Sequence, residues 1–157
     1  MHALARLALP LALAAAVLSC GGDSAGVEDP PKIEETEFAE SLGIDLALMT
    51  KTATGLYYRD LVVSEGPTAT VGVTVRVRYT GWLASGTEFD SNQGNGIAFQ
   101  LGANQVVKGF DEGIRGMRVG GKRQLIIPPN LGYGAGGSGA IPGNAILVFE
   151  VELVSIQ

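Results

Sequence analysis

The residues that bear most directly on chemistry are aromatic and branched aliphatic side chains spread between Tyr79 and Phe149, with one carboxylate among them. The set comprises Tyr79, Phe89, Asp90, Val106, Val107, Phe110, Tyr133, Ile141 and Phe149. Each apolar member is also a natural core residue. Tyr133 is the hardest to explain by packing, because it stands between Gly132 and Gly134 in a glycine-rich run and has little core to fill.

The groups needed for covalent catalysis are missing from the folded part of the chain. The sequence holds one histidine, His2, and one cysteine, Cys20, and both fall in or next to an N-terminal leader. Without an imidazole or a free thiol, the mature chain has no Ser-His-Asp or Cys-His site and no histidine-based metal site. We therefore predict neither a cofactor nor a metal ion.

Two motif-like strings fail on their context. Gly132–Gly137 fits G-x-G-x-x-G, but that fingerprint follows a strand and opens a helix, whereas Ala140–Ile141–Pro142 and a strand-like run come next. The run from Asp90 begins like a calcium loop, but Leu101 stands where the bidentate glutamate should be. A carboxylate pair for glycoside hydrolysis stays open, although nothing in the spacing selects one.

The chemistry that suits this set is rotation about a peptide bond. Resonance makes the C–N bond partly double and gives a barrier of about 18–20 kcal/mol, and X–Pro bonds exchange isomers in roughly tens to hundreds of seconds. The planar amide is more polar than the twisted one, so a bowl without water disfavours the ground state. A donor to the carbonyl oxygen then stabilises the rotated group.

The elements that must position these residues are strands with little helix. Period-two alternation or branched side chains predict strands at 56–63, 71–80, 122–127 and 146–156. An apolar stripe of Val106, Val107, Phe110 and Ile114 predicts a helix over 104–117, weakened by its glycines. The pattern indicates an α+β fold, a twisted antiparallel sheet wrapped around one short helix.

Segments in a fixed order resemble the FKBP-type peptidyl-prolyl cis-trans isomerases, a family that binds tacrolimus. They are Val77–Leu83, Gly86–Ser91, Gln105–Phe110, Val119–Lys122, Leu131–Gly134 and Leu147–Leu153. The resemblance implies an FKBP-like fold and rotamase activity on proline-containing polypeptide clients. Macrolide immunosuppressants would be further ligands.

The resemblance also assigns roles to single positions. Asp90 would polarise the pocket and Tyr133 would donate its hydroxyl to the substrate carbonyl, so these are the predicted catalytic residues. Val106 and Val107 would supply wall side chains and a backbone N–H for the ligand carbonyl, with Phe110 as the floor. The other predicted substrate-binding residues are Tyr79, Phe89, Ile97, Ile141 and Phe149.

The chain departs from the family pattern around Asp90. Ile97 stands where the family has a second pocket phenylalanine, and the loop 91–96 is shorter than in the best-known eukaryotic members. The arginine that partners the aspartate is not evident, and Arg78 and Gln93 are alternative partners. These departures bear on drug affinity and substrate preference more than on activity.

Residues 1–19 have the layout of a secretory signal peptide, with Arg6 ahead of an apolar run from Leu7 to Leu18. That run is shorter than the about 20 residues of a spanning helix. Cys20 stands where bacterial lipoprotein signals place the lipidated residue; the alternative is a plain signal with an incidental cysteine. We expect a chain anchored by lipid to a membrane of the bacterial envelope, facing the periplasm or the exterior.

The charge balance is acidic, with 11 basic against 16 acidic residues and a net charge of −5. This argues against nucleic acid, which requires a basic patch. We interpret residues 20–49 as a lipidated cysteine and an acidic flexible linker or arm, with Glu34–Glu37 as a solvated tether. Phe38, Leu42, Leu46 and Met49 have rough helical spacing within it, which allows a short helix or an ordered arm. Residues 50–157 would form the isomerase domain.

Two other functions compete with an active enzyme. One is a catalytically weak FKBP-fold module that binds peptides or acts as a chaperone, and the other is a structural surface lipoprotein. Retention of the whole aromatic set with Asp90 and Tyr133 favours the enzyme. Because no long dimerisation segment precedes the fold, we expect a monomer.

Overall fold

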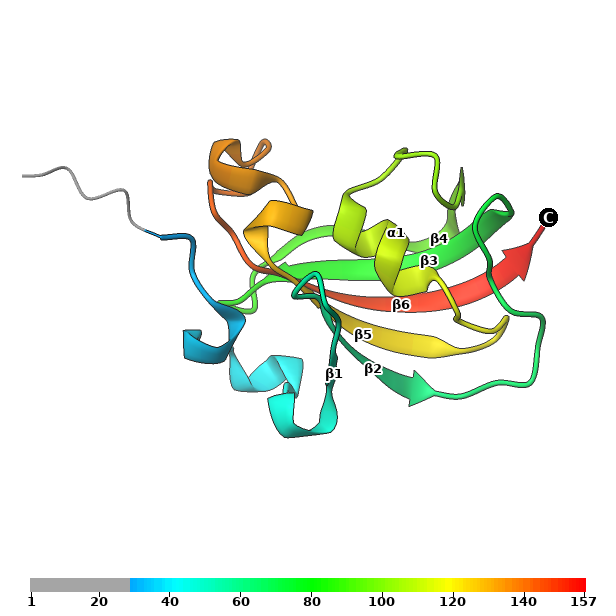
Figure 1. The fold of residues 1–157 in the computed structure, drawn as a ribbon, viewed down its shortest axis with the longest axis horizontal. Coiled ribbons are helices and arrows are strands. Elements are labelled where there is room, and N and C mark those ends of the chain that lie inside the picture. Colours follow the sequence, from blue (N-terminus) through cyan, green and yellow to red (C-terminus); the bar gives the residue numbers. More distant parts are fainter. Residues whose placement is uncertain (1–28) are drawn as a thin grey trace, which may run out of the picture.

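The computed structural model describes residues 29–157; the predicted signal peptide and Cys20 lie outside them. A six-stranded sheet of order β1-β2-β5-β6-β3-β4 curves around one short helix, as Figure 1 shows. Every neighbouring pair of strands is antiparallel. The elements are β1 (Thr50–Lys51), β2 (Tyr57–Val62), β3 (Thr74–Leu83), β4 (Glu88–Gln100), α1 (Lys108–Ile114), β5 (Lys122–Ile127) and β6 (Leu147–Ile156). The predicted α+β fold is confirmed.

Short 3-10 turns complete the described chain. They are η1 (Ile33–Glu35), η2 (Glu40–Leu42), η3 (Leu46–Leu48), η4 (Pro129–Leu131) and η5 (Gly134–Gly136). The first three precede the sheet, and the last two lie in the connection from β5 to β6. No helix within residues 29–157 has the length and apolar character needed to cross a membrane.

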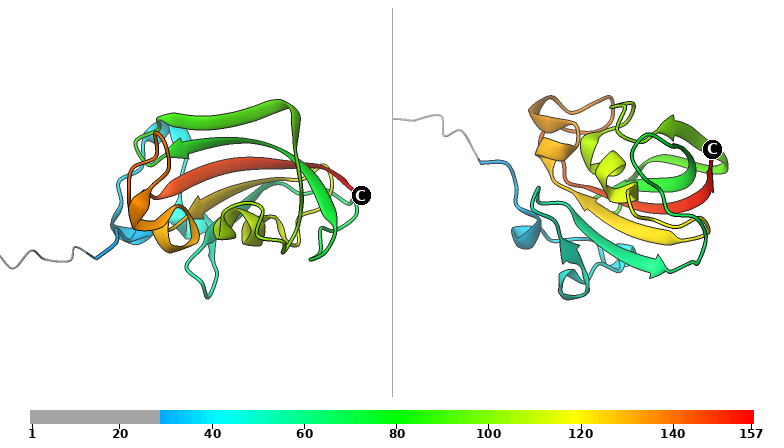
Figure 2. Two further views of the ribbon diagram at one scale, coloured as in Figure 1. Left: turned by 90° about the horizontal axis from the view of Figure 1, so that it is seen from above. Right: turned by 45° about the vertical axis from the view of Figure 1, so that its right-hand side comes forward.

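The alternation read from the sequence places the core between the sheet and α1. Val77 and Tyr79 of β3 and Phe149 and Val151 of β6 are buried in one cluster with Phe110 of α1. Successive side chains of a strand point to opposite faces, so the residues between them look away from the helix. The two further views in Figure 2 show the strands curving around α1.

The helix is shorter than predicted. A helix over 104–117 was expected, and α1 covers only Lys108–Ile114. Asn104 has φ of 55° and Gly116 has φ of 78°, both in the left-handed region that a right-handed helix cannot include. The side chains predicted to face the core do so at Phe110 and Ile114, which are buried.

The helix glycines have a packing function that their low helix propensity conceals. A Cβ atom on Gly109 would lie 2.5 Å from Cγ2 of Ile127, and one on Gly113 would lie 2.6 Å from Cδ1 of Leu125. Both partners are fully buried on β5. The two glycines therefore allow α1 to approach the sheet more closely than any other residue would permit.

The full length of strand β4 was not predicted, because residues 91–96 were interpreted as a loop. Its sequence is rich in serine, asparagine, glutamine and glycine, which have low strand propensity, and most of its side chains are exposed. As the edge strand it pairs only with β3, with register shifts between Val77 and Tyr79 and between Gly81 and Trp82. This hairpin carries Phe89, Asp90 and Ile97.

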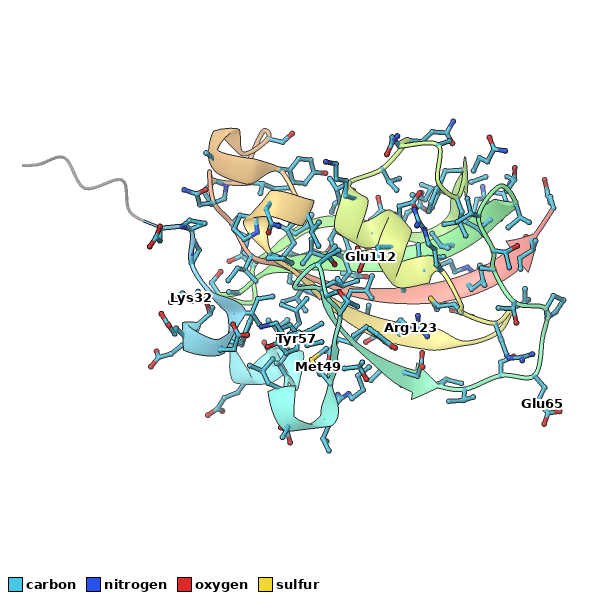
Figure 3. All side chains as sticks on the ribbon, viewed as in Figure 1. Lys32, Met49, Tyr57, Glu65, Glu112 and Arg123 are labelled. Carbon is cyan, nitrogen blue, oxygen red and sulfur yellow. The ribbon has the colours of Figure 1, made fainter. Side chains whose placement is uncertain are left out.

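The segment Ile33–Met49, called the arm below, packs on the face of the sheet opposite α1. Ile33 and Leu42 are buried there against Tyr57, Ile126 and Val148, and Figure 3 labels Met49 and Tyr57 where the arm meets β2. The sequence left a helix or an ordered arm open. The structure contains three 3-10 turns, and Gly43 with φ of 57° interrupts any longer helix.

The interpretation of Glu34 as part of a solvated tether was wrong. Its carboxylate accepts a 2.6 Å hydrogen bond from the hydroxyl of Tyr57 and forms a salt bridge with Lys51. The hydrogen bonds from Lys51 and then Tyr57 lower the pKa of Glu34 to about 2. The charge that suggested a tether instead attaches the arm to β1 and β2.

The close approach of α1 to the sheet can be tested with Gly109→Ala. Alanine favours a helix over glycine by about 1 kcal/mol, but overpacking a buried contact costs about 1–3 kcal/mol. Because Ile127 is β-branched and fully buried, we expect the packing cost to exceed the helix gain and the urea midpoint to fall. Gly94→Ala is the control, since its Cβ would meet nothing within 4 Å. A variant as stable as wild type would contradict the proposed role of Gly109.

Candidate active site

A cleft of about 170 Å³ opens where the helix, the strands and the loop after η4 meet. Its lining is mostly aromatic and aliphatic. The lining residues are Tyr79, Phe89, Asp90, Ile97, Gln105, Val106, Val107, Phe110, Tyr133 and Phe149. The structure therefore brings together every site residue predicted from the sequence within the described range, except Ile141.

Four aromatic rings form the floor and one wall of this cleft. The ring centroid of Phe110 lies 5.0 Å from that of Phe149 and 5.5 Å from that of Tyr79, and Phe89 lies 5.5 Å from Phe149. The interplanar angles are 65°, 75° and 88° in that order, the edge-to-face geometry that aromatic pairs favour. Each ring comes from a different element, so α1, β3, β4 and β6 must all be in place before the floor exists.

Gly81 provides the space for these rings. A Cβ atom at this position on β3 would lie 2.7 Å from Phe149 and 2.7 Å from Phe89. Any side chain at Gly81 would therefore displace two lining rings at once. Sequence reasoning used Gly81 only as part of a motif and did not detect this role.

The polar end of the cleft is a hydrogen bond between Tyr79 and Asp90. The hydroxyl of Tyr79 donates to Oδ2 of Asp90 at 2.6 Å. Burial, followed by the hydrogen bond from Tyr79 to Asp90, raises the pKa of Tyr79 above its ordinary value. Tyr79 thus stays protonated and donates across the physiological range, while Asp90 presents its remaining acceptor positions at the mouth of the cleft.

Neither residue suggested by the sequence as a partner for Asp90 has that role. The guanidinium of Arg78 donates through Nε to the carbonyl of Gly94 at 3.0 Å. The amide of Gln93 donates to Oγ1 of Thr80 at 2.9 Å. Tyr79, predicted only as a lining ring, is the partner, because β3 and β4 place the two side chains on the same face.

Two donors stand at the rim of the cleft. The side chain of Tyr133 is 40% exposed, on the loop between η4 and η5, and within residues 29–157 its hydroxyl has no protein partner. The backbone N–H of Val107 makes no hydrogen bond within the same range, although its carbonyl accepts from Phe110 and Asp111. A carbonyl oxygen bound in the cleft would have these groups as its nearest candidates for hydrogen bonding.

Ile141 does not line the cleft, so the structure does not support its predicted role as a wall. It is buried in the main core cluster, and its backbone pairs with that of Ser138 in both directions at 2.8 Å and 2.9 Å. This small turn directs the side chain inward. Conversely, Gln105 lines the cleft and was not assigned a role, although it begins the motif that contains Val106 and Val107.

No cluster of three or more histidine, cysteine, aspartate or glutamate side chains that could hold a metal ion is found in the part of the chain that the structure describes. The cleft itself contains one carboxylate, two phenol hydroxyls and one amide among apolar groups. Such a lining can exclude water, stack on an apolar ring and donate a few hydrogen bonds.

Comparison with known proteins gives one consistent family. Residues 66–154 match the model of the FKBP-type peptidyl-prolyl cis-trans isomerases. The FK506-binding protein of Neisseria meningitidis serogroup B (strain ATCC BAA-335 / MC58) is 49% identical over 105 residues, which cover 65% of this chain and 96% of that protein. FK506-binding protein 2 of Dictyostelium discoideum is 51% identical over 89 residues, which cover 55% of this chain and 67% of that protein.

Solved structures agree with these relatives. FkpA from Escherichia coli superposes with a TM-score of 0.66 at 36% identity, covering 75% of this chain and 55% of that one. AtFKBP13 superposes with a TM-score of 0.65, also at 36% identity, covering 69% of this chain and 98% of that one.

The Tyr79–Asp90 pair makes a prediction that does not require a substrate. In Asp90→Asn the charge beside the phenol is lost while burial remains, so we expect the pKa of Tyr79 to fall toward the ordinary value of about 10. The measurement is the ultraviolet absorbance of phenolate with rising pH, with Tyr79→Phe to identify the transition. Folding raises this pKa, so the protonated phenol of Tyr79 stabilises the folded state. That stabilisation is complete below about pH 10 and is lost as the pH rises through the raised pKa.

Glu65→Gln is the matched control for Asp90→Asn. Glu65 is an exposed carboxylate in the loop after β2 (Figure 3) and does not line the cleft, so its loss should leave the phenol unchanged. The same titration in Asp90→Asn and wild type would show that the hydrogen bond does not form in solution.

Proposed function

The chain belongs to the family of FKBP-type peptidyl-prolyl cis-trans isomerases, and we propose that its cleft accelerates X–Pro rotation by excluding water and hydrogen-bonding the amide, with no covalent step. The observation that carries this proposal is the cleft itself, in which four aromatic rings surround a space beside free hydrogen-bond donors. The enzyme is a rotamase by its family, and the steps below concern how its residues achieve rotation.

The first step is desolvation of the prolyl ring and its amide. The apolar ring of proline would lie on Phe110 and between the side chains of Tyr79 and Phe149, whose rings are buried or nearly so. Water then leaves both partners. Since the planar amide carries more charge separation than the twisted amide, losing water raises the free energy of the planar form more and lowers the barrier.

The second step is stabilisation of the rotated group. A donor that is already oriented costs no reorganisation at the moment of rotation. The hydroxyl of Tyr133 and the backbone N–H of Val107 are the donors proposed for the carbonyl oxygen. Tyr79 keeps Asp90 in place through their 2.6 Å hydrogen bond, so the carboxylate faces the amide nitrogen side of the twisted bond as a fixed negative charge.

The cleft is also the proposed site for FK506. The relatives that align with this chain over nearly their whole length are named FK506-binding proteins. Ile97 lines the cleft where the family pattern has an aromatic ring. That wall therefore offers less area for stacking, and we propose that it tunes drug affinity without removing the prolyl site.

The cellular setting is proposed from the sequence. We propose that residues 1–19 direct export, that Cys20 receives lipid, and that the monomeric enzyme works on proline-containing clients at a membrane of the bacterial envelope. The apolar run before Cys20 and the absence of any other cysteine support this. A single acyl chain anchors only marginally, so more than one chain on the cysteine would be needed for stable attachment.

The catalytic proposal is tested by measuring isomerisation of an X–Pro peptide. We expect Asp90→Ala, Phe110→Ala and Tyr133→Phe each to lower kcat/KM. The loss of one transition-state hydrogen bond, as in Tyr133→Phe, should lower it about 10-fold, which corresponds to about 1.4 kcal/mol. Tyr133→Phe should do so at nearly unchanged stability, because the side chain is exposed and loses one hydroxyl. Gln93→Ala, outside the cleft lining, is the control.

The pH profile separates this mechanism from acid–base catalysis. With no histidine in the folded chain, the wild-type rate should stay nearly flat between about pH 6 and 8, the range in which an imidazole titrates. A steep profile in that range, or unchanged turnover in all three variants, would refute the proposed site.

The anchor is tested by labelling cells that express the full chain with a radioactive fatty acid. We expect label on the wild type and none on Cys20→Ser, which should also leave the membrane fraction. Because Cys20→Ser leaves residues 29–157 unaltered, its isomerase activity serves as the control for folding. Label on the variant would mean that lipid attaches elsewhere, and an unlabelled wild type would mean that the leader acts as an ordinary signal.

A further inference from the structure

A second groove of about 490 Å³ adjoins the cleft and shares three lining residues with it. The shared residues are Val106, Val107 and Tyr133, which thus separate two spaces rather than close one. The groove continues over Asn104, Lys108, Pro129, Asn130, Gly132 and Gly134. It runs between the loop that precedes α1 and the loop that follows β5, the segments that face each other across the upper part of Figure 1.

The two volumes suggest that the cleft holds the prolyl ring of a client and that the groove holds the residues next to it. The cleft, at about 170 Å³, accommodates a single ring and its amide, whereas a client continues for many residues at about 3.3 Å each when extended. A chain leaving the cleft past Tyr133 enters the groove directly. There, the side-chain amides of Asn104 and Asn130 can both donate and accept, which suits the backbone of an extended peptide.

The groove has one charged side chain, and it is a cation. Lys108 is exposed at the first position of α1 and belongs to no salt bridge within residues 29–157. Glu112, one turn further along the helix and labelled in Figure 3, accepts a 2.7 Å hydrogen bond from the hydroxyl of Thr54 instead. The ammonium group is therefore available to a ligand.

The neighbouring groove beside the arm shows the contrast. It shares Pro129 and Asn130 with the groove of Lys108, but both of its lysines are neutralised, Lys32 by Glu35 at 3.1 Å and Lys51 by Glu34. In a chain with a net charge of −5, the groove that adjoins the cleft is thus lined by a cation with no carboxylate partner among the described residues. It gives this side of the site the opposite charge from Asp90.

We propose that the groove holds the client residues on one side of the proline and that Lys108 favours an acidic side chain there. This inference rests on the proposed function, because it concerns the same client. Lys108 would act in specificity by pairing with a carboxylate of the client. Basic side chains at that position would be repelled, and those on the other side of the proline would lie nearer to Asp90.

The test uses two series of X–Pro peptides that carry Glu, Gln or Lys either before or after the X–Pro pair. For wild type at low salt, we expect kcat/KM to be about two- to fivefold higher for Glu than for Lys in one series only, the range expected for an exposed ion pair. The preference should disappear in Lys108→Met, reverse in Lys108→Glu and shrink as salt screens the pair.

Lys122→Met is the matched control. It removes the same charge from the opposite end of β5, where Lys122 lies 4.0 Å from Glu152, and it should keep the full preference. A wild type with equal rates for Glu and Lys in both series, or a preference that persists in Lys108→Met, would overturn the inference. Neither result would affect the proposed function, whereas a wild type that left every peptide at its uncatalysed rate would refute the proposed function itself.

Discussion

The contact on which the rest of the structure depends is the seating of α1 on the sheet through Gly109 and Gly113. With no Cβ at these positions, Ile127 and Leu125 of β5 pack directly against the helix backbone. That depth sets where Phe110 lies, and its ring centroid falls 5.0 Å from Phe149 and 5.5 Å from Tyr79. A helix raised by one methyl group would separate these rings, so the packing of the core and the shape of the cleft are one constraint.

The cleft combines rings held on the sheet and the helix with hydrogen-bond donors held on loops. Its rings come from elements fixed by the sheet and the helix, whereas its donors lie at the rim, on loops. Tyr79 links the two kinds, because its ring belongs to the floor and its hydroxyl holds Asp90. A site of this kind needs no nucleophile. It lowers the barrier to rotation of a bound amide by excluding water and by offering hydrogen-bond donors that are already oriented.

The sequence was sufficient to predict the parts of the structure that follow a periodic pattern or match a motif. Alternation identified the core faces of β3 and β6, and the aromatic positions from Tyr79 to Phe149 converged on one cleft as expected. It failed where a residue acts through its neighbours in space. Gly81 makes room for two rings from two other strands, and one of them, Phe149, lies far along the chain. The partner of Asp90 depends on the pairing of β3 with β4, a strand whose polar composition concealed it, and Ile141 turns inward because its backbone pairs with Ser138.

The arm would have a mechanical consequence if the chain were held at its N-terminal end, as the proposed lipid anchor implies. The arm and the cleft lie on opposite faces of the sheet, since Val148 belongs to the cluster beneath the arm and Phe149 to the cluster beneath α1. A pulling force applied before Ile33 would first strain the links from Glu34 to Lys51 and Tyr57. The contacts of the arm with the sheet would break in sequence from its N-terminal end, before tension reached the strands. Loss of the arm's contacts would therefore precede any disturbance of the face that carries the cleft.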